Sequence, residues 1–191
     1  MRFLYCAACI CTILDDWSGM DTERAAQYVI QSISYEGGVG QGPGLEAHGG
    51  STFCGVAALS LMGRLADLGD RRLEQLTRWC LQRQAPASGF MGRPNKPEDT
   101  CYSFWVGATL SLLGKLEMTD TAASRRFVLS TQDPVTGGLA KWVDTQVDPL
   151  HTYLGLSGLG LQGEEGVAAV DPGLNISVRA KTWLLQIHAN W

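Results

Sequence analysis

The chain repeats one pattern of about fifty residues three times, over residues 28–63, 79–114 and 127–163. In each copy a glycine leads, ten residues later, to one polar residue, which is His48, Asp99 or Asp148 in turn. From that residue each copy runs without a gap into a stretch of small and apolar residues. A repeat of this length is typical of stacked supersecondary units that bury a shared core.

Two kinds of helical pattern alternate along the copies. Amphipathic helices are expected at residues 21–32, 73–84 and 122–131, and helices that are apolar all round at 51–65, 102–116 and 151–161. A buried helix is expected at residues 1–14 and a last helix at 178–188. Because all-round apolar helices belong inside and amphipathic ones outside, the pattern predicts an all-α protein with two concentric layers, an α/α barrel or toroid.

Composition narrows the function classes. With 15 Lys and Arg against 19 Asp and Glu and no basic run, the chain does not look like a nucleic-acid binder. No apolar stretch reaches the roughly 18 residues of a membrane span. The six cysteines form no CxxC pair and lie in apolar, helix-like segments, which indicates free thiols in a reducing, cytosolic setting. Residues 1–14 could also pass for a signal peptide, but their single charge and the acidic segment that follows favour a helix.

Three residues at the starts of neighbouring inner helices could bind a metal. Asp99, Cys101 and His151 together would give three zinc ligands and leave a fourth position open, as in a catalytic zinc site. Residues two apart do not share a helix face, so Asp99 and Cys101 could converge only where the helix begins. The alternative is that Asp99 caps the helix, Cys101 lies in the core and His151 is a polar residue with satisfied hydrogen bonds. Spacing alone leaves both interpretations open.

A cationic loop lies just before these residues. Residues 92–97 read Gly-Arg-Pro-Asn-Lys-Pro, and Arg93 and Lys96 could hold a phosphate at a helix N-terminus. His48, Gly49 and Gly50 occupy the equivalent place in the first copy, and the alternative for the loop is a solvated turn. Aromatic side chains gather near the same helix starts, where they either fill the interior or line an apolar cavity: Phe53, Tyr102, Phe104, Trp105, Trp142 and Tyr153.

Three stretches carry a resemblance to a known family: GRPNKPEDTCYSFWVGATL, LEAHGGSTFCGVAALSLMG, and STQDPVTGGLAKW followed by DPLHTYLGLSGL. They resemble the β subunits of protein prenyltransferases, most of all the geranylgeranyltransferase type I branch. The resemblance runs from Arg2 to the end of the chain and implies a single partial toroid domain over residues 1–191. It also implies that Asp99, Cys101 and His151 bind one zinc ion.

The resemblance implies roles for further residues. The isoprenoid diphosphate would be held by His48, Arg93, Lys96 and Tyr102, together with the loop residues Pro94 and Asn95. The wall around the lipid would include Gly49, Gly50, Ser103, Phe104 and Trp105. Residues near the peptide and lipid would be Arg2, Phe3, Tyr5 and Leu150.

Two positions separate the branches of the family. The farnesyltransferase branch has a tyrosine directly before the zinc histidine and a magnesium-binding aspartate ten residues before it. Here these positions hold Leu150 and Lys141, as in the geranylgeranyl branch, where a lysine ammonium stands in place of magnesium. The resemblance therefore implies an enzyme that needs zinc and not magnesium. It would transfer a geranylgeranyl group from geranylgeranyl diphosphate (GGPP) to the cysteine of C-terminal CaaX sequences, with X often Leu or Phe.

The same resemblance implies a cytoplasmic heterodimer with a helical-repeat α subunit, acting on CaaX-ending proteins such as small GTPases. Family β subunits carry a further N-terminal half, and this chain begins inside a family helix. About half a barrel would expose apolar inner helices, so we expect an isolated chain that is poorly soluble or needs its partner. A non-catalytic form that only binds zinc or the α subunit stays open. Terpene cyclases and complement-type toroids are disfavoured, because no DxDD, DDxxD or GCGEQ motif occurs.

Overall fold

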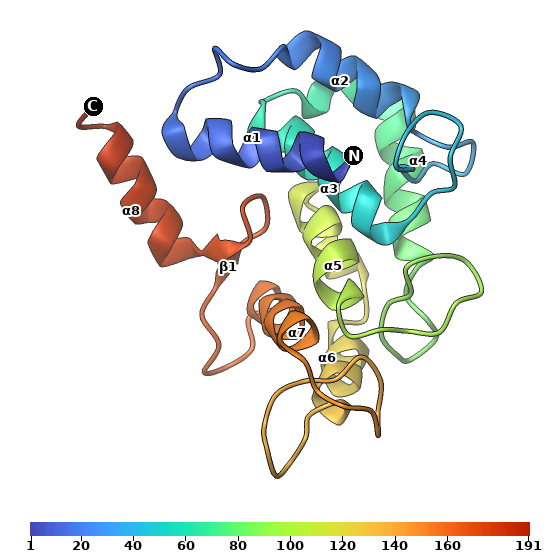
Figure 1. Cartoon of the computed structure of the whole chain (residues 1–191). Coiled ribbons are helices and arrows are strands. Elements are labelled where there is room, and N and C mark those ends of the chain that lie inside the picture. Colours follow the sequence, from blue (N-terminus) through green and yellow to red (C-terminus); the bar gives the residue numbers. More distant parts are fainter.

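A computed structural model describes the whole chain, residues 1–191, and shows an almost entirely helical protein (Figure 1). The helices are α1 (Arg2–Leu14), α2 (Thr22–Gln31), α3 (Gly49–Leu61), α4 (Gly69–Leu81), α5 (Tyr102–Leu112), α6 (Thr121–Ser130), α7 (Pro149–Leu161) and α8 (Val178–His188). Short 3-10 turns at Leu65–Leu68 and Leu116–Met118 follow α3 and α5. Two antiparallel strands, β1 (Val170–Asp171) and β2 (Ile176–Ser177), precede α8. None of the helices has both the length and the apolar character needed to cross a bilayer.

The helices form an inner and an outer row. In the inner row α3 packs against α1 and α5, and α5 packs against α7 (Figure 1). The outer helices α2, α4 and α6 each pack against the inner helix that follows them. Helices α3 and α5 bury most of their residues, because both are apolar on every face. This alternation is the arrangement predicted for part of an α/α toroid.

The helix limits differ from the expected ones by a few residues. Helix α3 begins at Gly49, inside the predicted loop, because the His48 ring accepts the Gly50 N–H and caps the helix there. Helices α3 and α5 end at Leu61 and Leu112, earlier than predicted, because the chain turns at Gly63 and Gly114, where φ is +68° and +64°.

Helix α2 is amphipathic, as expected for residues 21–32. The Asp21 side chain caps it by accepting the Arg24 N–H at 2.9 Å. The buried side of this helix is formed by Ala26 and Val29, whereas Tyr28 is exposed.

Helix α1 is present as predicted, but the expectation that it is buried is wrong. Only Met1, Ala8 and Cys11 of this segment are buried, whereas Phe3 is 88% exposed and Ile10 57% exposed. The reason is that α1 packs mainly against α3 and leaves its other faces open. Helix α7 also has exposed apolar side chains, those of Leu150, Tyr153 and Leu156.

The loop before each inner helix has the same hydrogen-bond scheme in all three copies. The backbone N–H groups of His48, Asp99 and Asp148 donate to the carbonyl oxygens of Val39, Phe90 and Leu139, at 3.2, 3.0 and 3.4 Å. The side chains of the same three residues then accept a backbone N–H from Gly50, Cys101 and His151, at or just before the first turn of the helix. The repeat thus delivers one polar side chain to the start of α3, α5 and α7.

Candidate functional site

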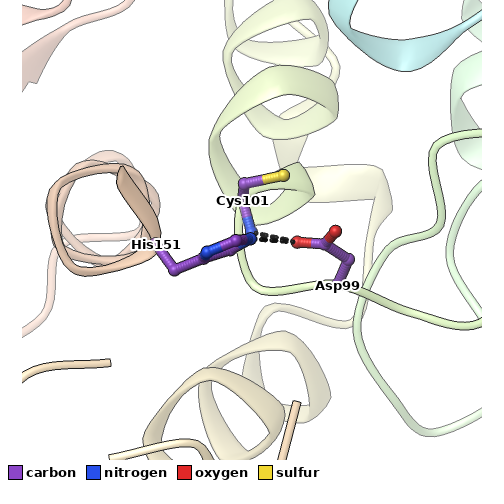
Figure 2. Close-up of side chains that lie close together, drawn as sticks. All are labelled: Asp99, Cys101 and His151. Atoms are coloured by element: carbon purple, nitrogen blue, oxygen red, sulfur yellow. Dashed lines mark hydrogen bonds and ion pairs between the residues drawn. The ribbon is translucent and has the colours of Figure 1, made fainter. Parts of the chain in front are cut away.

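Two of these helix starts contribute three residues to one compact cluster of ligand atoms. Asp99 and Cys101 come from the start of α5 and His151 from the first turn of α7, and Figure 2 shows the three side chains converging. One potential ligand atom from each residue, an oxygen, a sulfur or a nitrogen, lies within 4.8 Å of the others. His151 Nε2 is 3.2 Å from Asp99 Oδ1. The predicted metal trio is therefore brought together in space.

A local turn explains how Asp99 and Cys101 converge although they are only two residues apart. Asp99 Oδ1 accepts the Cys101 N–H at 2.9 Å, in the residues just before α5 becomes regular. Asp99 and Cys101 are each 7% exposed, and the side chain of His151 is 13% exposed. The cluster is thus shielded from bulk water but not sealed from it.

Asp148 fixes the orientation of the His151 ring. Its Oδ1 accepts the His151 backbone N–H at 2.9 Å, which caps α7, and its Oδ2 lies 2.6 Å from His151 Nδ1. Both ring nitrogens therefore face a carboxylate. A neutral imidazole has only one N–H, so it can donate to only one of these carboxylates. With the proton on Nδ1 and directed to Asp148, Nε2 presents a lone pair toward Asp99 and Cys101, as a metal ligand does.

The donor set fits zinc. Burial, with the nearby negative charge of Asp99 adding to it, raises the pKa of the Cys101 thiol, so the thiol stays protonated unless a cation compensates for the charge. A zinc ion supplies that compensation, because a coordinating thiol is deprotonated. Sulfur, nitrogen and carboxylate oxygen are the ligands that zinc takes in proteins, and three of them leave an open position for a substrate. Asp99, Cys101 and His151 are the residues that would hold the ion.

The role of Asp148 gives a first prediction. In Asp148→Asn the second carboxylate contact of His151 is lost, and we expect zinc affinity to fall by about 10- to 100-fold. Asp120→Asn is the matched control: Asp120 caps α6 by accepting the Ala123 N–H at 2.8 Å and lies outside the metal cluster. Both variants should keep their helix cap and nearly all of their stability, because Asn caps a helix about as well as Asp. Competition with a chromophoric chelator measures the affinities. Equal zinc affinity in the two variants would show that Asp148 acts only as a cap.

A polar cavity of about 410 Å³ adjoins the metal cluster and shares Asp99 with it. Its other lining residues are His48, Gly92, Arg93, Lys96, Pro97, Tyr102, Lys141 and Trp142. Gly92 is required there, because a Cβ at this position would overlap the Tyr102 ring. Three of the lining side chains are cationic, so the cavity favours an anionic ligand.

The hydrogen bonds of His48 determine which way Tyr102 donates. His48 Nδ1 accepts the Gly50 N–H at 3.0 Å, and Nε2 is 2.9 Å from the Tyr102 hydroxyl. Burial and the nearby Arg93 charge lower the pKa of His48, which favours the neutral ring. Since Nδ1 is an acceptor, the neutral ring carries its proton on Nε2 and donates it to the Tyr102 oxygen. Burial raises the pKa of Tyr102, so its own O–H is kept and is available to a ligand in the cavity.

Lys141 is held between two partners at the edge of this cavity. Its Nζ lies 3.6 Å from Asp99 Oδ2 and 4.3 Å from the centre of the Trp142 ring. The indole N–H of Trp142 donates to the Glu98 carbonyl at 2.6 Å, which anchors the ring. Trp142 was predicted only as a residue that fills the interior or lines a cavity.

No role was predicted for Asp148. Asp148 occupies the position in the third copy that His48 and Asp99 occupy in the first two, and this correspondence could have indicated its role.

The structure brings some of the other predicted residues to the cavity and not others. Arg93 lines it and is paired with Glu46 at 3.0 Å. Pro94 and Asn95 do not line it, because they form the exposed tip of the loop, where Asn95 has a φ of +59°. Ser103 faces α7 instead, since a Cβ at Gly158 would overlap its hydroxyl.

The predicted lipid and peptide residues are spread more widely. Tyr5 and Phe53 stack at 5.1 Å between ring centres, and Phe53 also contacts Phe104 and Trp105 at 5.0 and 5.2 Å. Gly49 lies against the Tyr102 ring. Three further residues are exposed to solvent: Arg2, Phe3 and Leu150. Phe104 is fully buried and belongs to the core.

Comparison with known proteins identifies the family of this chain. The prenyltransferase alpha-alpha toroid domain matches residues 1–176. The chain belongs to this prenyltransferase toroid family. The predicted fold class and the predicted resemblance are thereby confirmed.

Named relatives of the family define the branch. The geranylgeranyl transferase type-1 subunit beta of Arabidopsis thaliana is 44% identical over 188 residues, which cover 94% of this chain and 50% of that protein. The subunit of the same name from Dictyostelium discoideum is 43% identical over 185 residues, covering 96% and 52%. A structure titled Candida albicans protein geranylgeranyltransferase-I complexed with GGPP superposes with a TM-score of 0.89 and 26% identity, covering 97% of this chain and 56% of that one. The chain spans about half the length of these relatives.

Proposed function

We propose that this chain acts as the β subunit of a zinc-dependent protein geranylgeranyltransferase of type I. The observation that carries the proposal is the shared wall of the two sites: Asp99 belongs both to the Asp–Cys–His cluster and to the cationic cavity. A thiol held at the cluster and a diphosphate held in the cavity would therefore be neighbours. Relatives named geranylgeranyl transferase type-1 subunit beta support the same reaction.

The cavity residues would bind and stabilise the diphosphate of GGPP. Arg93 and Lys96 contribute positive charge from the loop, and Lys141 contributes it from beside Asp99. The Tyr102 hydroxyl, oriented by His48, donates a hydrogen bond. Because the negative charge on the diphosphate grows as its bond to carbon breaks, these donors act most strongly in the transition state.

The reaction is a substitution at C1 of the isoprenoid. The sulfur of the substrate cysteine forms a bond to C1, the C1–O bond breaks, and its electron pair leaves with the diphosphate, while the thiol proton is released to solvent. When bound, zinc supplies a lowered thiol pKa, so that thiolate is present near neutral pH. Asp99, Cys101 and His151 position the sulfur, and Lys141 stabilises the leaving group without a magnesium ion.

Apolar side chains would cover the lipid. Tyr5 and Trp105 are only partly buried and flank the fully buried Phe53 ring between α1, α3 and α5, so these two side chains would contact the lipid. Burial of isoprenoid carbons, at about 0.8 kcal/mol each, supplies on the order of 10 kcal/mol before the costs of binding.

We further propose that residues 1–191 form one partial toroid domain that works in the cytoplasm with an α subunit as partner. Its protein substrates would be CaaX-ending proteins such as small GTPases, with X often Leu or Phe.

The function of Lys141 provides a test of the proposal. In Lys141→Asp we expect geranylgeranyl transfer to fall roughly 100-fold without magnesium and to recover in part at millimolar magnesium, because the new carboxylate can bind the ion. The unaltered chain should be indifferent to magnesium. The matched control is Lys115→Asp, an equal charge change at an exposed lysine outside the cavity. Transfer to a CaaX peptide, assayed with the α subunit present, gives the rates. A Lys141→Asp variant that ignores magnesium would contradict the charge-replacement role.

A further inference from the structure

Arg83, directly after α4, is the one buried lysine or arginine of the chain, with 5% of its surface exposed. Its Nε donates to the Trp79 carbonyl at 3.3 Å, and its guanidinium carbon lies 4.7 Å from the centre of the Trp79 ring. Its Nη1 is buried and has no acceptor in the protein. A buried cation that has no ion-pair partner is unfavourable. Glu36 lies beyond ion-pair distance, so an anion bound beside Arg83 would stabilise it.

Three of the more exposed arginines have ion-pair partners. Arg64, Arg93 and Arg125 each have a carboxylate partner. No ion pair includes Arg83. Exposed arginines without an ion pair, such as Arg78, are solvated by water, so Arg83 differs in combining the missing ion pair with burial.

A second unused donor belongs to the Trp79 ring, over which the Arg83 guanidinium lies. Trp79 is 2% exposed, and its indole N–H also has no acceptor. Trp79 and Arg83 line one cavity of about 360 Å³, together with Arg78, Gln82 and Glu36. Two guanidinium groups thus face a single carboxylate, and the Glu36 carboxylate is exposed and accepts a hydrogen bond from the Tyr35 hydroxyl at 3.2 Å. The wall offers N–H donors and excess positive charge, which suits a ligand that only accepts hydrogen bonds.

We propose that this cavity binds a small oxyanion, a phosphate or a carboxylate, with Arg83 and Arg78 supplying charge and Trp79 a hydrogen bond. The site is separate from the proposed diphosphate cavity, but the two share a loop. Pro94 lines the oxyanion cavity, and its loop neighbours Arg93 and Lys96 line the diphosphate cavity. An oxyanion bound here would therefore contact the loop that also serves the proposed reaction.

Phosphate binding tests the proposal independently of catalysis. The 191-residue chain with Arg93→Ala and Lys96→Ala, co-purified with an α subunit, lacks two exposed cations of the diphosphate cavity and serves as the background. Calorimetric titration with inorganic phosphate, at constant ionic strength set with chloride, should still show one phosphate per chain. Adding Arg83→Gln should weaken binding at least about tenfold, because a charge-assisted bidentate partner is lost. Parallel titration with acetate distinguishes a phosphate ligand from a carboxylate, and either result supports an oxyanion site.

Glu36→Gln keeps the test decisive if Arg83→Gln fails to fold, because Glu36 is exposed. Removing its negative charge should tighten phosphate binding by about threefold, through the loss of repulsion at the wall. The proposal is overturned if the background binds neither phosphate nor acetate, which would mean that ordered water satisfies the two donors. It is also overturned if binding persists unchanged in both Arg83→Gln and Glu36→Gln. Geranylgeranyl transfer does not enter these readouts, so this proposal and the proposed function can fail separately.

Discussion

Cys101→Ala should abolish stoichiometric zinc binding, with a loss of affinity greater than the roughly 100-fold that outer contacts of a metal site reach. Cys101 is the only sulfur in the cluster, and the remaining Asp99 and His151 would hold the ion through one oxygen and one nitrogen. If the cluster holds zinc as proposed, binding depends on a thiolate, because burial and Asp99 disfavour the free thiolate and a bound cation reverses this.

The measurement is zinc content per chain by elemental mass spectrometry, on protein co-purified with an α subunit. Cobalt substitution adds a second readout, a sulfur-to-metal absorption band that should vanish with Cys101. Cys80→Ala is the matched control, since Cys80 is a buried thiol with 1% exposure and is not one of the three residues of the metal cluster. Equal zinc content in the Cys101→Ala and Cys80→Ala proteins would show that the cluster is not a zinc site.

Phe53→Ala should lower the free energy of unfolding by about 3–5 kcal/mol. Phe53 is fully buried at the centre of an aromatic cluster, with ring centres 5.1 Å from Tyr5, 5.0 Å from Phe104 and 5.2 Å from Trp105. These contacts join α1, α3 and α5, so the truncation leaves a cavity at the point where three inner helices meet. The loss therefore combines burial with the removal of three edge-to-face or tilted aromatic contacts.

Urea denaturation followed by circular dichroism measures this change. Tyr35→Ala is the control, because Tyr35 is 96% exposed and its removal should change stability by less than about 0.5 kcal/mol. A loss below about 1 kcal/mol in Phe53→Ala would mean that the aromatic cluster is not packed as a core.

The repeat and the helix periodicity predicted the fold because both record which faces are buried. Helices α3 and α5 are apolar all round, so their inner position could be predicted from composition alone. The extent to which α1 is buried could not be predicted, since this extent depends on the elements that pack against α1 and not on the sequence of the helix itself. The strands β1 and β2 were not predicted, because two residues each are too short to show an alternating pattern.

The candidate site was predictable where the residue types themselves indicate the chemistry. The donor types of Asp99, Cys101 and His151 pointed to a metal, although spacing left a structural interpretation open, and the distances bring the three together. Pairwise contacts were not predictable. The Trp142 ring under Lys141 and the unpaired Arg83 depend on where loops fold back, and a charged residue after an amphipathic helix is ordinarily expected to be solvated.

Geranylgeranyl transfer by the 191-residue chain with an α subunit tests the central claim most directly. The assay uses radiolabelled GGPP and a peptide with a C-terminal CaaL sequence, with farnesyl diphosphate as the competing donor. We predict zinc-dependent transfer that prefers the geranylgeranyl group and is absent in Cys101→Ala. A chain that binds one zinc ion and GGPP but transfers nothing would contradict this, and would identify a non-catalytic form that keeps the binding residues alone.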